Sequence, residues 1–265
     1  MKRAFSIALL FALCFMPVEG SYSADQAVDA EKNSYLMKLE ERYQKAIALR
    51  EKGAYDESLA LLQQLVNENQ GSAKFEIARL DTILEQSRDM KESDNIAWKN
   101  KAREAGYRIK TLLAANSANS DYWVVYAKYS WLVEANKETH ITKAIKKAFY
   151  YKPDNPEAYI VQADYNFDKA RESSSDSKQN TMMQGVGSNT EPDRYNFAKA
   201  AKSSYEAALS GKLSDARRAY VHYKMGNVKD RILQEPESAK KDWEEAIRLS
   251  PDSKAGKLSR QRLGI

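Results

Sequence analysis

The chain has very few of the residues that build catalytic and metal sites. Its 265 residues include one cysteine, Cys14, and two histidines, His140 and His222. A lone cysteine excludes an intrachain disulfide and a cysteine-based metal site. Neither histidine belongs to an H-E-x-x-H motif, and the sequence has no G-x-S-x-G nucleophile elbow and no phosphate-binding glycine loop. We therefore expect no enzyme activity, no cofactor and no metal, and we interpret His222 as a buried packing residue.

Turn-forming residues are also scarce, which favours helices over strands. The chain has only 10 glycines and 6 prolines, and from Ser120 onward no apolar–polar alternation is bounded by turn signals. Apolar residues make up 43% of the chain, enough for a sizeable core. The composition therefore predicts an all-helical protein.

Long apolar runs are absent except at the N-terminus. Met1-Lys2-Arg3 is basic, residues 4–16 are apolar, and small residues follow up to Ala24. The run is too short to span a bilayer and is typical of a secretory signal peptide. We expect a signal peptide at 1–23 and an exported, periplasmic domain at 24–265 without an integral membrane segment. Lipidation of Cys14 is disfavoured because Leu13 occupies a position where lipoprotein signals carry a small residue.

A short pattern recurs five times along the chain. A residue that is usually small is followed by a bulky residue four positions later and by apolar residues at seven and eight positions; the pattern begins at Ser58, Ala105, Ile141, Ala201 and Ala239. These spacings share one helical face, so each copy predicts an amphipathic helix. Other amphipathic runs pair a large residue with a small one four later: Trp123 with Ala127, Tyr159 with Ala163, and His222 with Gly226.

These residues resemble the tetratricopeptide repeat, a helix–turn–helix of about 34 residues with the pattern W-x2-L-G-x2-Y, A-x3-F and P. The likeness covers roughly residues 39–253, although the family's Leu-Gly survives only as Met225-Gly226. It implies an all-α, right-handed α-α superhelical solenoid of about five repeats. We place the repeats at roughly 39–72, 73–119, 120–155, 156–218 and 219–253, a capping helix at 254–265, and a mobile polar insertion at 173–193.

The resemblance also places the helical stripe beside the packing face in a concave groove. On the helix after Ser120, Trp123, Ala127 and Ser130 form the packing face. The candidate partner-binding groove comprises Tyr43, Ile47, Val124, Lys128, Trp131, Ile160, Asp164, Phe167, Tyr223 and Asn227. Aromatic anchors with few charges are typical of peptide grooves, although aromatic stripes at this spacing also occur in cores. The family's Lys and Asn clamp is replaced by Tyr43 and Ile47, so a ligand with a free C-terminal carboxylate is not expected.

The charge balance is only mildly basic, with 42 Lys and Arg against 37 Asp and Glu. Basic residues crowd the end, where a polar capping helix is expected rather than a nucleic-acid site. We interpret the scattered carboxylates as solvated helix faces. The sequence predicts an exported, non-catalytic scaffold that binds a protein or extended peptide, with the oligomeric state left open. The alternatives are an accessory component of an envelope transport or secretion system that holds a small solute between helices, and a helical-repeat cell-wall hydrolase.

Overall fold

The computed structural model describes residues 19–93, 96–133, 137–180 and 190–265. The chain divides into two compact units, Met1–Arg42 and Tyr43–Ile265. The described part of the first unit is a single helical stretch, residues 19–42 of α1 (Glu19–Glu51). Most of the predicted signal peptide, residues 1–18, lies outside the described residues. None of the described helices is long and apolar enough to cross a membrane.

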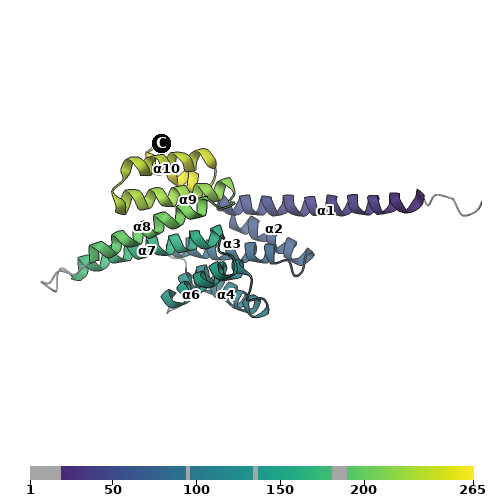
Figure 1. Ribbon diagram of the computed structural model, residues 1–265, viewed down its shortest axis with the longest axis horizontal. Helices are drawn as coiled ribbons and strands as arrows, with labels where there is room; N and C mark the ends of the chain where they lie inside the picture. The colour runs from purple at the N-terminus through teal and green to yellow at the C-terminus, as the bar shows by residue number, and fades with distance from the viewer. Residues whose placement is uncertain (1–18, 94–95, 134–136, 181–189) are drawn as a thin grey trace, which may run out of the picture. The chain divides into compact units, whose positions relative to one another are not determined.

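The second unit is built from pairs of helices, and its described residues contain no strand (Figure 1). Ser58 donates a hydrogen bond to the carbonyl of Ala46, which packs the end of α1 against α2. The pairs after α1 and α2 (Tyr55–Glu68) are α3 (Ala73–Glu92) with α4 (Trp98–Ala115), α5 (Ser120–Val133) with α6 (Lys137–Tyr151), α7 (Pro156–Asn180) with α8 (Thr190–Leu209), and α9 (Asp215–Val228) with α10 (Pro236–Leu249). A last helix, α11 (Lys254–Leu263), packs against α9 and α10. The all-α repeat prediction, with five pairs and a terminal helix, is confirmed.

The turns between helices also join neighbouring pairs. Asn155 precedes α7, and its side-chain oxygen accepts a hydrogen bond from the amide of Glu157, which caps the helix start. Its amide group donates to Ser120 and Asp121 on α5, both at 2.8 Å. Pro156 then occupies the first helical position, where its missing N–H costs nothing. One short linker thus fixes α7 against α5.

The apolar stripes form a chain of local cores, each shared by consecutive helices. One core lies among α3, α4 and α5, a second among α5, α6 and α7, and a third among α7, α8, α9 and the short π-helix η1 (Lys229–Leu233). The predicted pattern residues Ala105, Ile141, Ala201 and Ala239 are all buried. Burial that links each unit only to its neighbours is the packing expected of a repeat protein.

The polar segment 173–193 is helical at both ends. Helix α7 continues to Asn180 and α8 begins at Thr190, while residues 181–189 lie outside the described residues. Residues 173–180 and 190–193 of the predicted insertion are therefore helical. Once a helix is nucleated, each added residue gains a backbone hydrogen bond at small cost. Ser173 also turns its hydroxyl back to the carbonyl of Lys169, at 2.9 Å.

Candidate partner-binding groove

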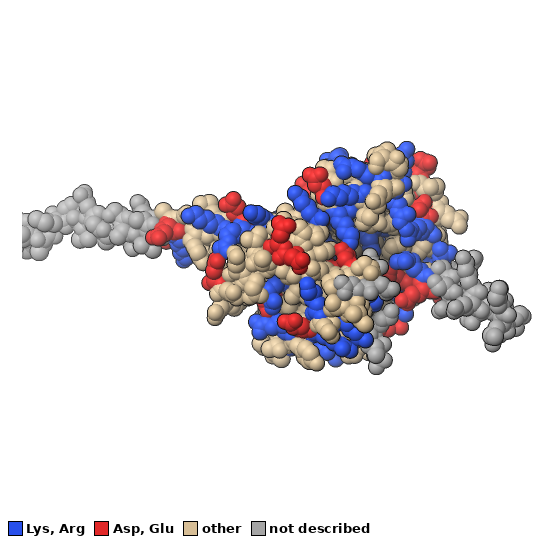
Figure 2. All heavy atoms as spheres, turned by 180° about the vertical axis from the view of Figure 1, so that it is seen from behind, with Lys and Arg blue, Asp and Glu red and all other residues tan. Residues whose placement is uncertain are grey.

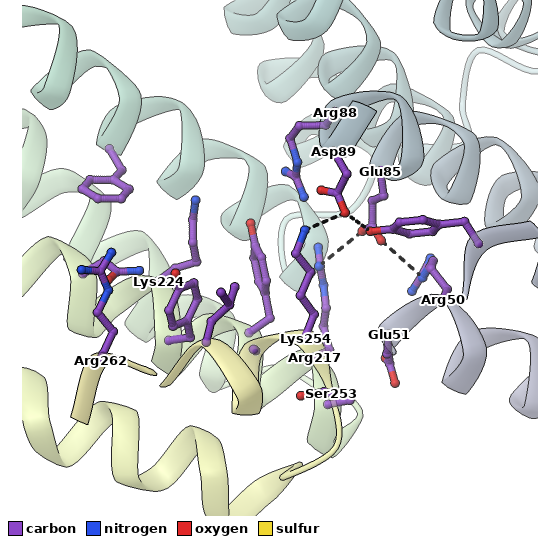
Figure 3. Close-up of a pocket in the computed structure, with 18 of the residues that line it drawn as sticks. Arg50, Glu51, Glu85, Arg88, Asp89, Arg217, Lys224, Ser253, Lys254 and Arg262 are labelled. Atoms are coloured by element: carbon purple, nitrogen blue, oxygen red, sulfur yellow. Dashed lines mark hydrogen bonds and ion pairs between the residues drawn. The ribbon is translucent and has the colours of Figure 1, made fainter. Parts of the chain in front are cut away.

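Two adjoining cavities open between the first helices of the repeats. The first has a volume of about 230 Å³ and is lined from α1, α2, α3, α7, α9, η1 and α11; we call it the basic pocket (Figure 3). The second, of about 370 Å³, is lined from α3, α5, α7 and α9, and we call it the Trp131 cavity. Glu85, Arg88, Arg217 and Tyr220 belong to both walls. The two cavities therefore form one groove.

Positive charge dominates the basic pocket. Its wall carries eight basic side chains and three acidic ones, Glu51, Glu85 and Asp89. The basic side chains are Arg50, Arg88, Arg171, Arg217, Lys224, Arg231, Lys254 and Arg262. Lys and Arg also gather on the surface over the C-terminal helices in Figure 2. The pocket concentrates a charge excess that is small over the whole chain, and it favours anionic groups.

A row of ion pairs crosses the groove from repeat to repeat. Arg50 on α1 and Lys128 on α5 both bind Asp81 on α3, at 3.0 and 2.6 Å. Arg217 on α9 binds Glu157 on α7 through two hydrogen bonds, of 2.7 and 2.6 Å. Each first helix of the five repeats thus contributes one or more charged side chains, and the signs alternate along the row. The interpretation of the carboxylates as solvated is wrong for Asp81, which is buried.

The surrounding cations keep these carboxylates ionised. Burial by itself would raise the pKa of Asp81, but the charges of Lys128 and Arg50 outweigh it and hold that pKa well below its usual range. The pKa of Glu157 is lowered in the same way, since Arg217 and Lys128 together overcome the effect of burial. The row is therefore charged at neutral pH and serves as a fixed electrostatic framework.

Asp164 joins three helices at the floor of the Trp131 cavity. Its carboxylate accepts hydrogen bonds from the hydroxyls of Tyr205 on α8 and Tyr220 on α9, the latter at 2.6 Å. The Lys224 ammonium lies 3.5 Å away. Burial would raise the pKa of Asp164, but Lys224 and Arg88 prevail and lower it. Each of its carboxylate oxygens accepts a tyrosine hydrogen bond, so Asp164 connects α7 to α8 and α9 at the groove.

Arg88 differs from the other cations at the centre of the groove. Its guanidinium lines both cavities, and Figure 3 shows it reaching toward the same space as Arg217. Glu85, Asp89 and Asp164 lie in its surroundings. No described acidic side chain forms an ion pair with it at 4.0 Å or less, and it donates no hydrogen bond within the described part of the chain. Among the described residues, Arg88 is thus a positioned, partly buried cation without a direct acceptor.

Six of the ten predicted groove residues line the two cavities. Phe167, Tyr223 and Asn227 belong to the wall of the basic pocket, and Lys128, Trp131 and Asp164 to that of the Trp131 cavity. Phe167 is also part of the core among α7, α8 and α9, with 3% of its surface exposed.

The other four predicted groove residues lie elsewhere. Val124 and Ile160 are 4% and 0% exposed, because each belongs to an apolar core that its helix shares with neighbouring helices. Tyr43 packs on Phe75 with ring centroids 5.7 Å apart. Ile47 is half-buried, and like Tyr43 it lines neither cavity.

The predicted packing residues fall mainly in the core. Ala127 and Ser130 are fully buried, whereas Trp123 is partly exposed and donates its indole N–H to the carbonyl of Ser117. His222 places Nδ1 3.1 Å from a carboxylate oxygen of Asp242 on α10, with 15% of its side chain exposed. It acts as a packing and hydrogen-bonding residue between α9 and α10.

Sequence reasoning missed Arg50, Arg88 and Arg217. Lys128 and Asp164 carry opposite charges at matching positions of successive repeats, but they do not pair with each other, since Lys128 binds Asp81 and Asp164 binds Lys224. The sequence therefore held no direct signal for the three arginines.

No protein-family model matches the chain, and no curated protein is significantly similar to it. Among solved structures, the crystal structure of the MamA protein is similar, with 10% sequence identity and a TM-score of 0.36. The alignment covers 86% of this chain and 96% of the MamA chain. The helix pairs and the cores that they share show an all-α helical repeat.

Proposed function

We propose that this protein is a non-catalytic scaffold that binds an extended segment of a partner protein in the groove formed by the basic pocket and the Trp131 cavity. Helical repeats characteristically use the surface formed by successive units for binding. The observation that carries the proposal is Arg88, a positioned cation that has no direct acceptor among the described residues and lies at the junction of a charged cavity and a partly apolar one.

One observation favours the hydrolase alternative. Asp164 and Asp168 lie one helical turn apart on α7 and both line the Trp131 cavity. Burial raises the pKa of Asp168, whereas the pKa of Asp164 is lowered. Two neighbouring carboxyl groups whose pKa values are shifted in opposite directions are typical of acid–base catalysis. However, tyrosine hydroxyls occupy both oxygens of Asp164, which leaves it unable to act on a substrate without rearrangement. We therefore favour binding.

Selection of peptides by the purified full chain tests the proposal. Random 12-residue segments displayed internally, without a free C-terminus, are selected on the wild-type protein and on a Trp131→Ala, Arg88→Gln double variant. Enriched peptides are then synthesised and their Kd measured by fluorescence polarisation. We expect the double variant to weaken them at least tenfold. Arg103→Gln is the matched control, because Arg103 is exposed on α4 and lines neither cavity. Equal affinity for all three proteins, or no enrichment on the wild type, contradicts the proposal.

Export to the cell envelope is the second part of the proposal. It rests on the order of basic, apolar and small residues in 1–24. N-terminal sequencing of the protein from a bacterial envelope fraction is expected to begin near Ser21 or Ala24. An intact Met1 on protein recovered from the cytosol would contradict export, and a lipid on Cys14 would show that Leu13 does not prevent lipidation.

A further inference from the structure

The Trp131 cavity offers a partly apolar site beside the charged one. Leu84, Trp131, Leu132 and Val161 contribute apolar wall from α3, α5 and α7. Its volume of about 370 Å³ lies within the range of roughly 300–1,000 Å³ that is usual for ligand sites. Trp131 is half-buried, so its ring both packs against the α5–α7 core and borders the cavity. A large aromatic or aliphatic side chain suits this wall.

The position of Arg88 links the contents of the two cavities. Because Arg88 belongs to both walls, a group bound next to an occupant of the Trp131 cavity lies close to the guanidinium. In an extended segment, neighbouring residues follow each other at about 3.3 Å. A guanidinium binds a carboxylate through two parallel hydrogen bonds, which makes an acidic side chain its natural ligand.

The apolar wall beside Arg88 favours a peptide over a simple anion. Inorganic phosphate can bind a guanidinium, but it has no apolar group to place against Trp131, Leu132 and Val161. A peptide supplies both an acidic and an apolar group on neighbouring residues.

We infer that the groove selects a segment in which a bulky apolar side chain stands next to acidic residues, the apolar group entering the Trp131 cavity and an acidic group binding Arg88. This inference rests on the proposed function and deepens it. The remaining cations of the basic pocket, among them Arg231 and Arg262, extend the preference to more than one acidic residue.

Matched synthetic peptides test this selectivity. The probe is a fluorescent peptide in a Gly-Ser host, blocked at both ends, with one tryptophan flanked on each side by two glutamates. Its comparison peptides replace all four glutamates by glutamine, or the tryptophan by alanine. With the full wild-type chain we expect each replacement to raise Kd about tenfold or more, since hydrogen bonds to charged groups and buried aromatic rings each contribute at that level.

The variants assign each preference to one side chain. Arg88→Gln is expected to reduce the glutamate preference severalfold with the tryptophan preference kept, and Trp131→Ala the reverse. Arg88→Lys keeps the charge but cannot donate two parallel hydrogen bonds, so its glutamate preference should lie between those of the wild type and Arg88→Gln. The glutamate preference of Arg103→Gln should match that of the wild type. Melting temperatures of all variants check that folding is intact.

Three outcomes would overturn the inference. Equal binding of the glutamate and glutamine probes would remove the acidic preference, even if peptides selected from the display library still bind and the proposed function stands. A preference that survives in both Arg88→Gln and Trp131→Ala would place the site elsewhere. If inorganic phosphate or a 20-nucleotide thymidine strand displaces the labelled probe at the same concentration as the unlabelled probe does, the groove is a general anion site.

Discussion

Arg217 on α9 holds both carboxylate oxygens of Glu157 on α7, 60 residues earlier in the chain, with N–O distances of 2.7 and 2.6 Å. The two side chains are only 11% and 32% exposed. The apolar core among α7, α8 and α9 already joins these two helices, which are the first helices of the fourth and fifth repeats. The ion pair adds a polar connection between them on the groove side.

Removing one partner should cost more than removing both. Arg217→Met leaves the Glu157 carboxylate with only Lys128, 3.7 Å away, and we expect a loss of about 2–3 kcal/mol, somewhat below the figure for fully buried pairs. The double change Arg217→Met, Glu157→Leu should recover much of that loss, because no unpaired charge remains. Urea unfolding gives the free energies, with Arg103→Met as the control. Additive single and double effects would contradict the pairing.

Acid should destabilise the protein through the same row of ion pairs. The pKa values of Asp81, Glu157 and Asp164 are lowered in the folded state, relative to about 3.9 for Asp and 4.3 for Glu in unfolded chains. The unfolded chain therefore binds protons more readily than the folded one. Their stabilising contribution is complete above about pH 5 and is lost as the pH falls through the unfolded values toward the folded ones. Burial raises the pKa values of Glu51 and Asp168, which oppose this trend.

Urea unfolding at pH 7, 5, 4 and 3 measures the effect. Lys128→Met removes a cation that lowers the pKa of both Asp81 and Glu157, so its stability should depend less steeply on pH below 5. Lys257→Met, at an exposed position of α11, should keep the wild-type slope. An identical slope in Lys128→Met would show that these carboxylates do not set the acid response.

Gly226 is a position where the packing of α9 on α10 needs a residue without a side chain. A Cβ placed there would lie 2.5 Å from Nε1 and 2.8 Å from Cδ1 of Trp243 on α10. Gly226→Ala should therefore cost about 1–3 kcal/mol through overpacking, although alanine is the better helix former by about 1 kcal/mol. Trp243→Ala alone should cost about 3–5 kcal/mol because it leaves a cavity.

The two changes are expected to couple. In the Trp243→Ala background the space next to Gly226 is empty, so adding Gly226→Ala should cost nothing further or gain stability. Glu244→Ala, exposed on the same helix as Trp243, serves as the near-neutral reference. Equal costs of Gly226→Ala in both backgrounds would mean that the ring does not limit the approach of α9 to α10.

Local periodicity was enough to predict the fold, but it could not predict the ion pairs of the candidate groove. The packing stripes that begin at Ala105 or Ala201 depend on spacing within one helix, which the sequence shows directly. The contact of Lys128 with Asp81 joins residues 47 positions apart, and no pattern in a single sequence reports such a pair. Most of the predicted groove residues follow a predicted packing residue by one position. Adjacent residues of a helix point about 100° apart, so a small rotation of the helix decides whether such a residue lines the groove or lies in the core. Trp131 fell on the groove side and Ile160 on the core side.

Trp131 and Phe167 were both predicted to line the groove, but their burial differs. Both line the groove, but Phe167 is 3% exposed within the core among α7, α8 and α9, whereas Trp131 is half-buried at the edge of its core. Phe167→Ala should cost about 3–5 kcal/mol and lower the melting temperature clearly. Trp131→Ala should cost less than half as much and weaken the tryptophan–glutamate probe about tenfold, because its ring faces the cavity more than the neighbouring helices.

Melting curves and probe affinities measured on both variants decide the assignment. Tyr150→Ala is the reference, since Tyr150 is a large, exposed aromatic residue on α6 that lines neither groove cavity. If Trp131→Ala melts as early as Phe167→Ala, the indole is a core group, and its effect on binding would follow from loss of structure. If Trp131→Ala melts near the wild type and still binds the probe fully, the apolar half of the ligand lies elsewhere. Only stable folding together with weakened binding agrees with an indole that contacts the partner, because a side chain stabilises mainly what it packs against.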